Sequence, residues 1–230
     1  MKELDTIGKL IKTKTHLLDM EKSSKRMILM VLYILKHSNR GEISMNLKFS
    51  VFFDITDVDN FFDSIILSTA SKKNCMQSYK SEKKPTLSEI TNIMDCVRII
   101  YRNNKSLIIY EDNLIDGGWT YINTIAKKFD IKTLYVRIKD EQPFPAYYLA
   151  YFENNTERII YNIKENRWIF FKKGPAAFFE EDEKYLENKV ADKFNKEKIL
   201  LFCQRLGIDV LNEQFFVPVS PVYCMQRRKD

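Results

Sequence analysis

Short apolar segments with partial alternation recur in the second half of the chain and predict β-strands. They are rich in Ile, Tyr and Phe and cover residues 132–139, 146–152, 157–163 and 168–172. Turn-forming residues such as Asn154 and Asn155 separate them. Strands at this spacing, joined by such turns, typically form a meander of hairpins. The pattern therefore predicts a mostly antiparallel central sheet over about residues 132–172.

Helical periodicity is strongest immediately before this region. Apolar residues between Ile90 and Tyr101 fall on one helical face, which predicts a helix over residues 86–102. Thr86 and Glu89 have the spacing of a reciprocal capping box, in which each side chain accepts a hydrogen bond from the other residue's backbone N–H. Further helices are predicted at residues 58–67, 117–129, 181–194 and 196–206.

The ends of two of these helices carry recognisable signals. Asp116 is the expected N-cap of the helix at 117–129, and Lys127 and Lys128 lie in its last turn, where cations interact favourably with the helix dipole. Gly207 is the expected stop of the helix at 196–206.

The first half of the chain is less regular. The apolar run at 27–35 favours a buried helix, although periodicity alone does not separate it from a central strand. Strands are predicted at 43–53 and 106–110, and a polar, Lys-rich loop at 68–85. The last 20 residues, with two prolines, predict an extended packed tail.

These elements predict an α+β fold, a central mostly antiparallel sheet packed by N-terminal, middle and C-terminal helices. We expect one domain over 1–230. The alternative division is an N-terminal region at 1–70, a basic loop at 71–85 and a main domain at 86–230. The chain has 230 residues, 45% hydrophobic and 13% aromatic, with only six Gly and six Pro, which excludes a disordered or collagen-like class.

The cysteines and the apolar run at 27–35 bear on localisation. Four scattered cysteines contain no C-x-x-C pair, and no signal peptide precedes them. The nine-residue run is far shorter than the roughly 20 residues needed to span a bilayer. We therefore expect a cytoplasmic protein with reduced thiols, no membrane partner, and Cys96 and Cys203 in its core on apolar helix faces.

Catalytic signatures are scarce. Only His16 and His37 could serve as histidine bases or ligands, and neither has a neighbouring carboxylate or cysteine cluster. Cys75 beside Lys72 and Lys73 is a nucleophile candidate without a partner base. No phosphate-binding glycine motif occurs, so we expect no cofactor and favour a non-enzymatic protein.

One acidic set remains as a hypothetical enzyme centre. Glu111 and Asp112 directly follow the strand predicted at 106–110 and Asp116 comes soon after, so the three carboxylates could bind a metal. A restriction-type nuclease would also need Glu-x-Lys on an adjacent strand, and Glu187 to Lys189 falls on a predicted helix instead. We therefore predict no metal site and keep an effector enzyme as the third hypothesis.

Charge distribution suggests the candidate surfaces. The net charge is +6, with the excess mainly in the N-terminal half. The candidate partner-binding residues are an acidic rim and a basic loop: Glu180, Glu181, Asp182, Glu183, Lys72, Lys73, Lys83 and Lys84. Aromatic and basic residues interleave at 158–173, as in sheets that stack single-stranded nucleic acid. Apolar residues on both strand faces favour a sheet covered by helices instead.

The function that this sequence favours is binding of a cognate protein. A stable α+β chain without a catalytic centre is similar in type to bacterial immunity proteins, which neutralise contact-dependent toxins by masking their sites. No residue motif carries that similarity, so it assigns no residue a role. The alternative is a nucleic-acid-binding or nucleic-acid-processing accessory protein that uses the basic excess.

Overall fold

The structure is a computed structural model. It describes residues 45–69, 76–87, 96–114, 118–180, 185–219 and 221–227. The apolar run at 27–35, expected to form a helix or a strand, lies outside these residues, as do His16, His37 and Cys75. No helix of the described ranges is long and apolar enough to cross a membrane.

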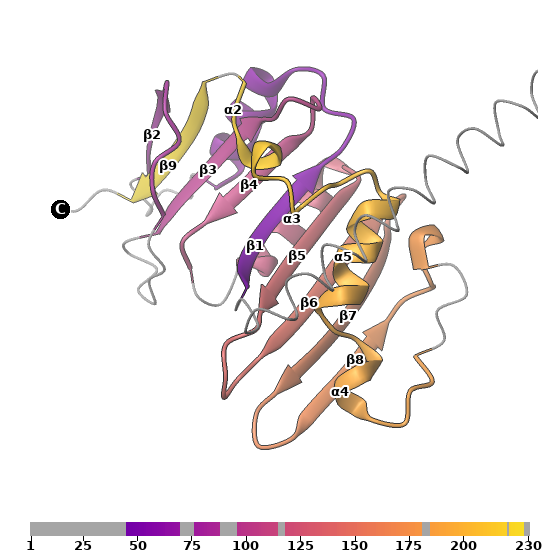
Figure 1. Cartoon of the computed structure of the whole chain (residues 1–230). Coiled ribbons are helices and arrows are strands. Elements are labelled where there is room, and N and C mark those ends of the chain that lie inside the picture. Colours follow the sequence, from indigo (N-terminus) through magenta and orange to yellow (C-terminus); the bar gives the residue numbers. More distant parts are fainter. Residues whose placement is uncertain are drawn as a thin grey trace, which may run out of the picture. The chain divides into compact units, whose positions relative to one another are not determined.

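A nine-stranded antiparallel sheet organises the described residues, in the order β2-β9-β3-β4-β1-β5-β6-β7-β8 (Figure 1). The strands are β1 (Asn46–Phe52), β2 (Met76–Ser81), β3 (Val97–Arg102), β4 (Ile108–Asp112), β5 (Thr133–Lys139), β6 (Ala146–Glu153), β7 (Thr156–Lys164), β8 (Trp168–Lys173) and β9 (Val222–Arg227). The predicted α+β fold with a central antiparallel sheet is confirmed, and the meander at 132–172 forms strands β5 to β8.

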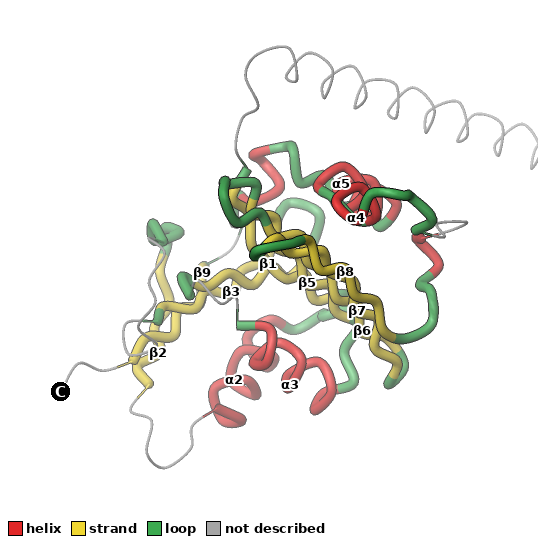
Figure 2. Tube along the Cα trace, turned by 90° about the horizontal axis from the view of Figure 1, so that it is seen from below, coloured by secondary structure: helices red, strands yellow, loops and turns green. Residues whose placement is uncertain are grey.

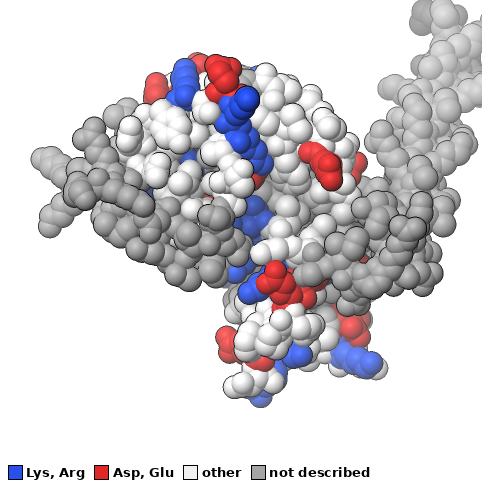
Figure 3. Space-filling model, turned by 60° about the vertical axis from the view of Figure 1, so that its left-hand side comes forward, with Lys and Arg blue, Asp and Glu red and all other residues white. Residues whose placement is uncertain are grey.

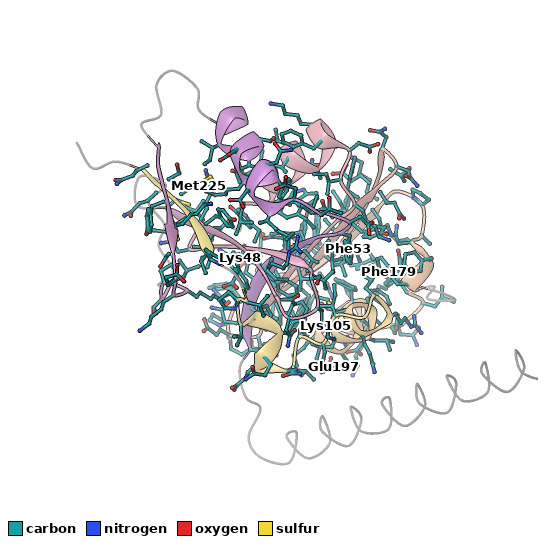
Figure 4. The ribbon with its side chains drawn as sticks, turned by 90° about the horizontal axis from the view of Figure 1, so that it is seen from above. Lys48, Phe53, Lys105, Phe179, Glu197 and Met225 are labelled. Carbon is teal, nitrogen blue, oxygen red and sulfur yellow. The ribbon has the colours of Figure 1, made fainter. Side chains whose placement is uncertain are left out.

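Helices cover both sides of this sheet (Figure 2). On one side lie α2 (Val58–Thr69) and α3 (Trp119–Phe129). On the other lie α4 (Val190–Lys193), α5 (Lys196–Arg205) and the short 3-10 helices η2 (Phe178–Glu180) and η3 (Glu213–Phe216). Met225 of β9 projects towards α2, whereas Glu197 of α5 lies on the opposite side (Figure 4).

Each side has its own aromatic-rich core because successive strand residues point to opposite faces. On the α2–α3 side, the Phe52 ring packs edge-on against Phe61 of α2 at 5.1 Å between ring centroids. On the α5 side, Phe179 lies 5.5 Å from Phe202. Burial of apolar surface is the dominant favourable contribution to folding, and these rings are a large part of the buried surface.

Residues 97–102 form strand β3, so the predicted helix over 86–102 is wrong for this segment. Ile99, Ile100 and Tyr101 are all fully buried because β3 lies between β4 and β9 with layers on both faces. A continuous apolar run satisfies a buried strand as well as a helix face. The capping residue Glu89 lies outside the described residues.

The predicted loop at 68–85 contains strand β2, and its partner is the C-terminal tail. β9 pairs with β2 on one side and β3 on the other. The tail is extended, as predicted, but it is an inner strand of the sheet. The sequence carries no local signal for this pairing, because β2 and β9 lie far apart along the chain.

The C-terminal helices agree only in part with the prediction. α5 begins after Asn195, whose side chain accepts a hydrogen bond from the Lys198 amide at 3.1 Å, and it ends before Gly207 as predicted. The predicted helix at 181–194 is wrong over its described part: only α4 is helical. Tyr185 has a left-handed backbone, φ 54°, which an α-helix does not accommodate.

Helix α3 has the predicted extent at its C-terminus, with Lys127 and Lys128 in the last turn. Its N-cap is Gly118, with φ 59° and no side-chain cap, so the predicted capping by Asp116 is wrong. A Cβ at Gly118 would lie 2.3 Å from Oδ2 of Asp112. Both the left-handed backbone and this close approach require glycine.

Candidate functional site

The carboxylates Glu111 and Asp112 lie on opposite faces of the sheet and share no site. Glu111 accepts hydrogen bonds from the Tyr101 hydroxyl and from Lys84 Nζ, each at 2.5 Å. Asp112 points to the α3 side and pairs with Lys48 Nζ at 2.7 Å. Asp116 is outside the described residues, among which no group of three His, Cys, Asp or Glu side chains could hold a metal.

The Asp112 carboxylate connects strands β1 and β4 and the segment that follows β4. Besides Lys48 of β1, it accepts the Tyr110 hydroxyl at 3.1 Å and the Leu114 amide at 3.0 Å. Lys48 lies in the interior of the molecule (Figure 4), where its charge is balanced by this carboxylate. Burial and the nearby Asp112 charge raise the pKa of Tyr110, so its hydroxyl stays a donor. The arrangement is structural support for the start of α3.

Glu180, a residue of the predicted acidic rim, is buried with an exposed fraction of 1%. Its carboxylate accepts Arg158 Nε at 2.7 Å, Arg158 Nη2 at 2.6 Å and the Tyr185 hydroxyl at 2.6 Å. Burial, followed by the hydrogen bond to Glu180, raises the pKa of Tyr185. The carboxylate is therefore committed to the interior. Residues 181–183 lie outside the described residues.

The basic loop is placed in part. Lys72 and Lys73 lie outside the described residues, Lys83 is exposed, and Lys84 is half-buried in its ion pair with Glu111. On the side that brings the β2 edge forward, basic side chains lie among acidic and uncharged ones (Figure 3). The described part of the predicted partner-binding set thus offers one unengaged exposed charge, Lys83.

Three cysteines are buried free thiols: Cys96, Cys203 and Cys224. The expectation that Cys96 and Cys203 belong to the core is confirmed, although Cys96 precedes strand β3 and does not lie on a helix. Burial raises the pKa of all three thiols, that of Cys203 to about 12.

We predict that the full chain carrying Cys75→Ser reacts only slowly with a thiol-reactive disulfide reagent at about pH 8, because the thiolate is the reactive species. The absorbance change on reagent addition measures this rate. Denaturant should release all three remaining thiols at once. A thiol that reacts within seconds in the folded protein would contradict the described burial.

An apolar surface that ends in the exposed side chains Ile169 and Phe171 lies on the α3 side of the sheet. Helix α3 packs against β5 and β6, whereas β7 and β8 extend beyond it (Figure 2). We call this surface the outer sheet face. It consists of Arg137, Lys139, Tyr148, Tyr161, Ile163, Ile169 and Phe171.

Three rings of this face form a ladder across neighbouring strands. Tyr148 and Tyr161 are 5.8 Å apart with planes at 5°, and Tyr161 and Phe171 are 4.9 Å apart at 20°. Trp119 of α3 lies 6.2 Å from Tyr148 and closes the inner end. Ile169 and Phe171 at the outer end are 39% and 40% exposed.

Sequence reasoning noted these aromatic and basic residues but expected helices over both faces. Helix α4 packs against β7 and β8 on the opposite side, whereas the described helices leave the outer sheet face open. The alternation along β7 and β8, with Tyr161 and Phe171 in register, was the available signal. That alternation does not tell how far α3 extends over the sheet, and therefore which strand residues it leaves uncovered.

Comparison with models of known protein families, with curated proteins and with solved structures found no match.

Proposed function

We propose that this protein is a non-enzymatic, cytoplasmic protein-binding protein, an immunity or inhibitor protein that neutralises a toxin by masking its site. The observation that supports it most directly is the outer sheet face, where Tyr, Phe and Ile lie beside Arg137 and Lys139. Aromatic residues and Arg are enriched in protein interfaces and dominate their binding energy. A surface on a broad sheet is also rigid, which lowers the entropic cost of binding.

The ring geometry favours a protein partner over nucleic acid. Tyr148 and Tyr161, and then Tyr161 and Phe171, stack face to face with an offset. Their faces therefore cover one another, and the ring edges and Tyr hydroxyls are left for a partner. A nucleobase needs a free ring face, and the ladder supplies one mainly at Phe171. Ring edges and hydroxyls suit the mixed polar and apolar contacts of a protein interface.

The other charged residues support a scaffold role in preference to catalysis. Glu180 is satisfied by Arg158 and Tyr185, and Glu111 by Tyr101 and Lys84. Buried charges held in such pairs stabilise one arrangement of the chain. A masking protein needs only that arrangement and a complementary surface, whose electrostatics set the association rate and specificity.

We predict that Phe171→Ser weakens binding of the cognate protein by about ten-fold or more, as expected for an interface aromatic. The tagged full chain is expressed in its source cells and the partner that co-purifies at one-to-one ratio is identified. Affinity for the purified partner is measured by titration calorimetry, and neutralisation by the loss of the partner's toxic activity.

The matched control is Phe178→Ser, which removes an aromatic that is 62% exposed on the other side of the sheet. It should leave the affinity within about two-fold. The proposal fails if no purified partner binds at a defined ratio, or if binding leaves the partner fully toxic. Equal losses in both variants would place the contact elsewhere.

A further inference from the structure

The backbone register arranges the outer sheet face as two rows that cross four strands. One row runs Arg137, Tyr148, Tyr161, Phe171, and the other Lys139, Ala146, Ile163, Ile169. Each row starts with a cation on β5 and ends with an apolar side chain on β8. Three strand spacings separate these ends, about 14 Å in all, which is slightly more than the width of one α-helix.

At the β5 end of this surface, the cations have no ion-pair partner among the residues that the structure describes. Neither Arg137 nor Lys139 forms an ion pair with another described residue. The α3 side of strands β5 to β8 carries one carboxylate, Glu157. It is already engaged by Lys173 at 3.2 Å and Lys127 of α3 at 3.7 Å. The face therefore presents an apolar strip beside a cationic strip.

We propose that the outer sheet face docks an acidic protein surface in which a row of carboxylates lies beside an apolar stripe. This inference rests on the proposed function and names the chemistry of the partner. The partner's carboxylates contact Arg137 and Lys139, where the guanidinium can bind a carboxylate through two parallel hydrogen bonds. Its apolar side chains cover Ile163, Ile169 and Phe171.

A helix or strand with these two stripes fits the dimensions of the face. Ala146, the residue between Lys139 and Ile163 in its row, has a side chain of a single methyl group, so it adds little bulk between its two larger neighbours. A second copy of this chain fits less well, because face-to-face contact would bring the unpaired cations of both copies into one interface. Like charges at such short range are costly.

The test uses two synthetic amphipathic helical peptides of about 18 residues, or five turns. Both carry the same Leu stripe; one has flanking Glu residues and the other has Lys at the same positions. Fluorescence anisotropy measures their affinity for the full chain, and an oligothymidylate is the nucleic-acid probe. The wild type should bind the Glu peptide at least about ten-fold more tightly than the Lys peptide, and this preference should shrink at about 0.5 M salt.

The variant Arg137→Glu/Lys139→Glu should reverse the preference in favour of the Lys peptide. A reversal cannot come from misfolding, which would abolish both affinities. The control Lys105→Glu/Lys189→Glu makes the same charge change at exposed residues outside the face and should retain the wild-type preference.

Three results would overturn the inference: no preference in the wild type, the same preference in the reversed variant, or tighter binding of the oligothymidylate that the reversal abolishes. The peptide assay does not need the natural partner. If a cognate protein binds Phe171→Ser weakly but binds Arg137→Glu/Lys139→Glu as tightly as the wild type, this inference fails and the proposed function stands. If the wild type prefers the Glu peptide but no cognate protein is found, the proposed function fails and this inference stands.

Discussion

Glu180→Ala is expected to lower the free energy of unfolding by about 3–5 kcal/mol, the range for removing one member of a buried ion pair. The variant leaves the Arg158 guanidinium, only 5% exposed, without its carboxylate. It also removes the acceptor of the Tyr185 hydroxyl and of the Ala177 amide. Each buried donor left without a partner adds its own desolvation cost.

Urea unfolding followed by circular dichroism measures this loss. The control is Arg158→Met/Glu180→Leu, which removes both charges and keeps apolar volume. It should be more stable than Glu180→Ala, since paired apolar replacements are often close to neutral. If Glu180→Ala costs less than about 1 kcal/mol, the carboxylate is exchanging with solvent and the described network is wrong.

Gly174→Ala is expected to cost about 3 kcal/mol, the second-largest effect. Gly174 follows β8 with φ 83°, where a Cβ costs about 1–2 kcal/mol. That Cβ would also lie 1.9 Å from the carbonyl oxygen of Glu157, a backbone atom of β7 that cannot rotate away. Moving this backbone disturbs Arg158, whose Nη1 donates to the Gly174 carbonyl at 2.8 Å.

Gly207→Ala is the matched control. Gly207 has a similar left-handed backbone, φ 75°, but a Cβ there meets no atom within 4 Å. We expect only the backbone penalty, about 1–2 kcal/mol. The comparison uses the same urea unfolding assay, and the difference between the two variants isolates the clash at Glu157. Equal losses would mean that β7 and the segment after β8 can separate at little cost.

The sequence predicts best those elements whose interactions are local. Strands β5 to β8 are joined by short turns, so each strand pairs with its neighbour along the chain. Gly207 indicates where α5 ends, and the two lysines in the last turn of α3 indicate where that helix ends. These signals act within a few residues and do not depend on the rest of the fold.

The acidic hypothesis shows where a local rule was available but incomplete. Glu111 and Asp112 are adjacent, and neighbouring strand residues point to opposite faces. That rule separates them once the strand is known to extend to Asp112. The strand predicted at 106–110 stopped short of both residues, whereas β4 continues through them because it pairs with β3.

Elements that depend on distant partners were decided by the tertiary structure. Residues 97–102 suit a helix or a strand by composition, and pairing with β4 and β9 makes them a strand. Glu180 was predicted on an exposed acidic rim, yet Arg158, 22 residues earlier, holds it in the interior. The residues next to Glu180 in the sequence do not indicate that it pairs with Arg158.

The sequence by itself determined the α+β class and the β5–β8 meander, because alternation and turn residues act locally. It also supplied the aromatic and basic residues of the outer sheet face. Only the tertiary structure decided which of them remain open to a partner. Exposure depends on where α3 ends above the sheet and on α4 covering the opposite side, and both follow from packing between distant segments.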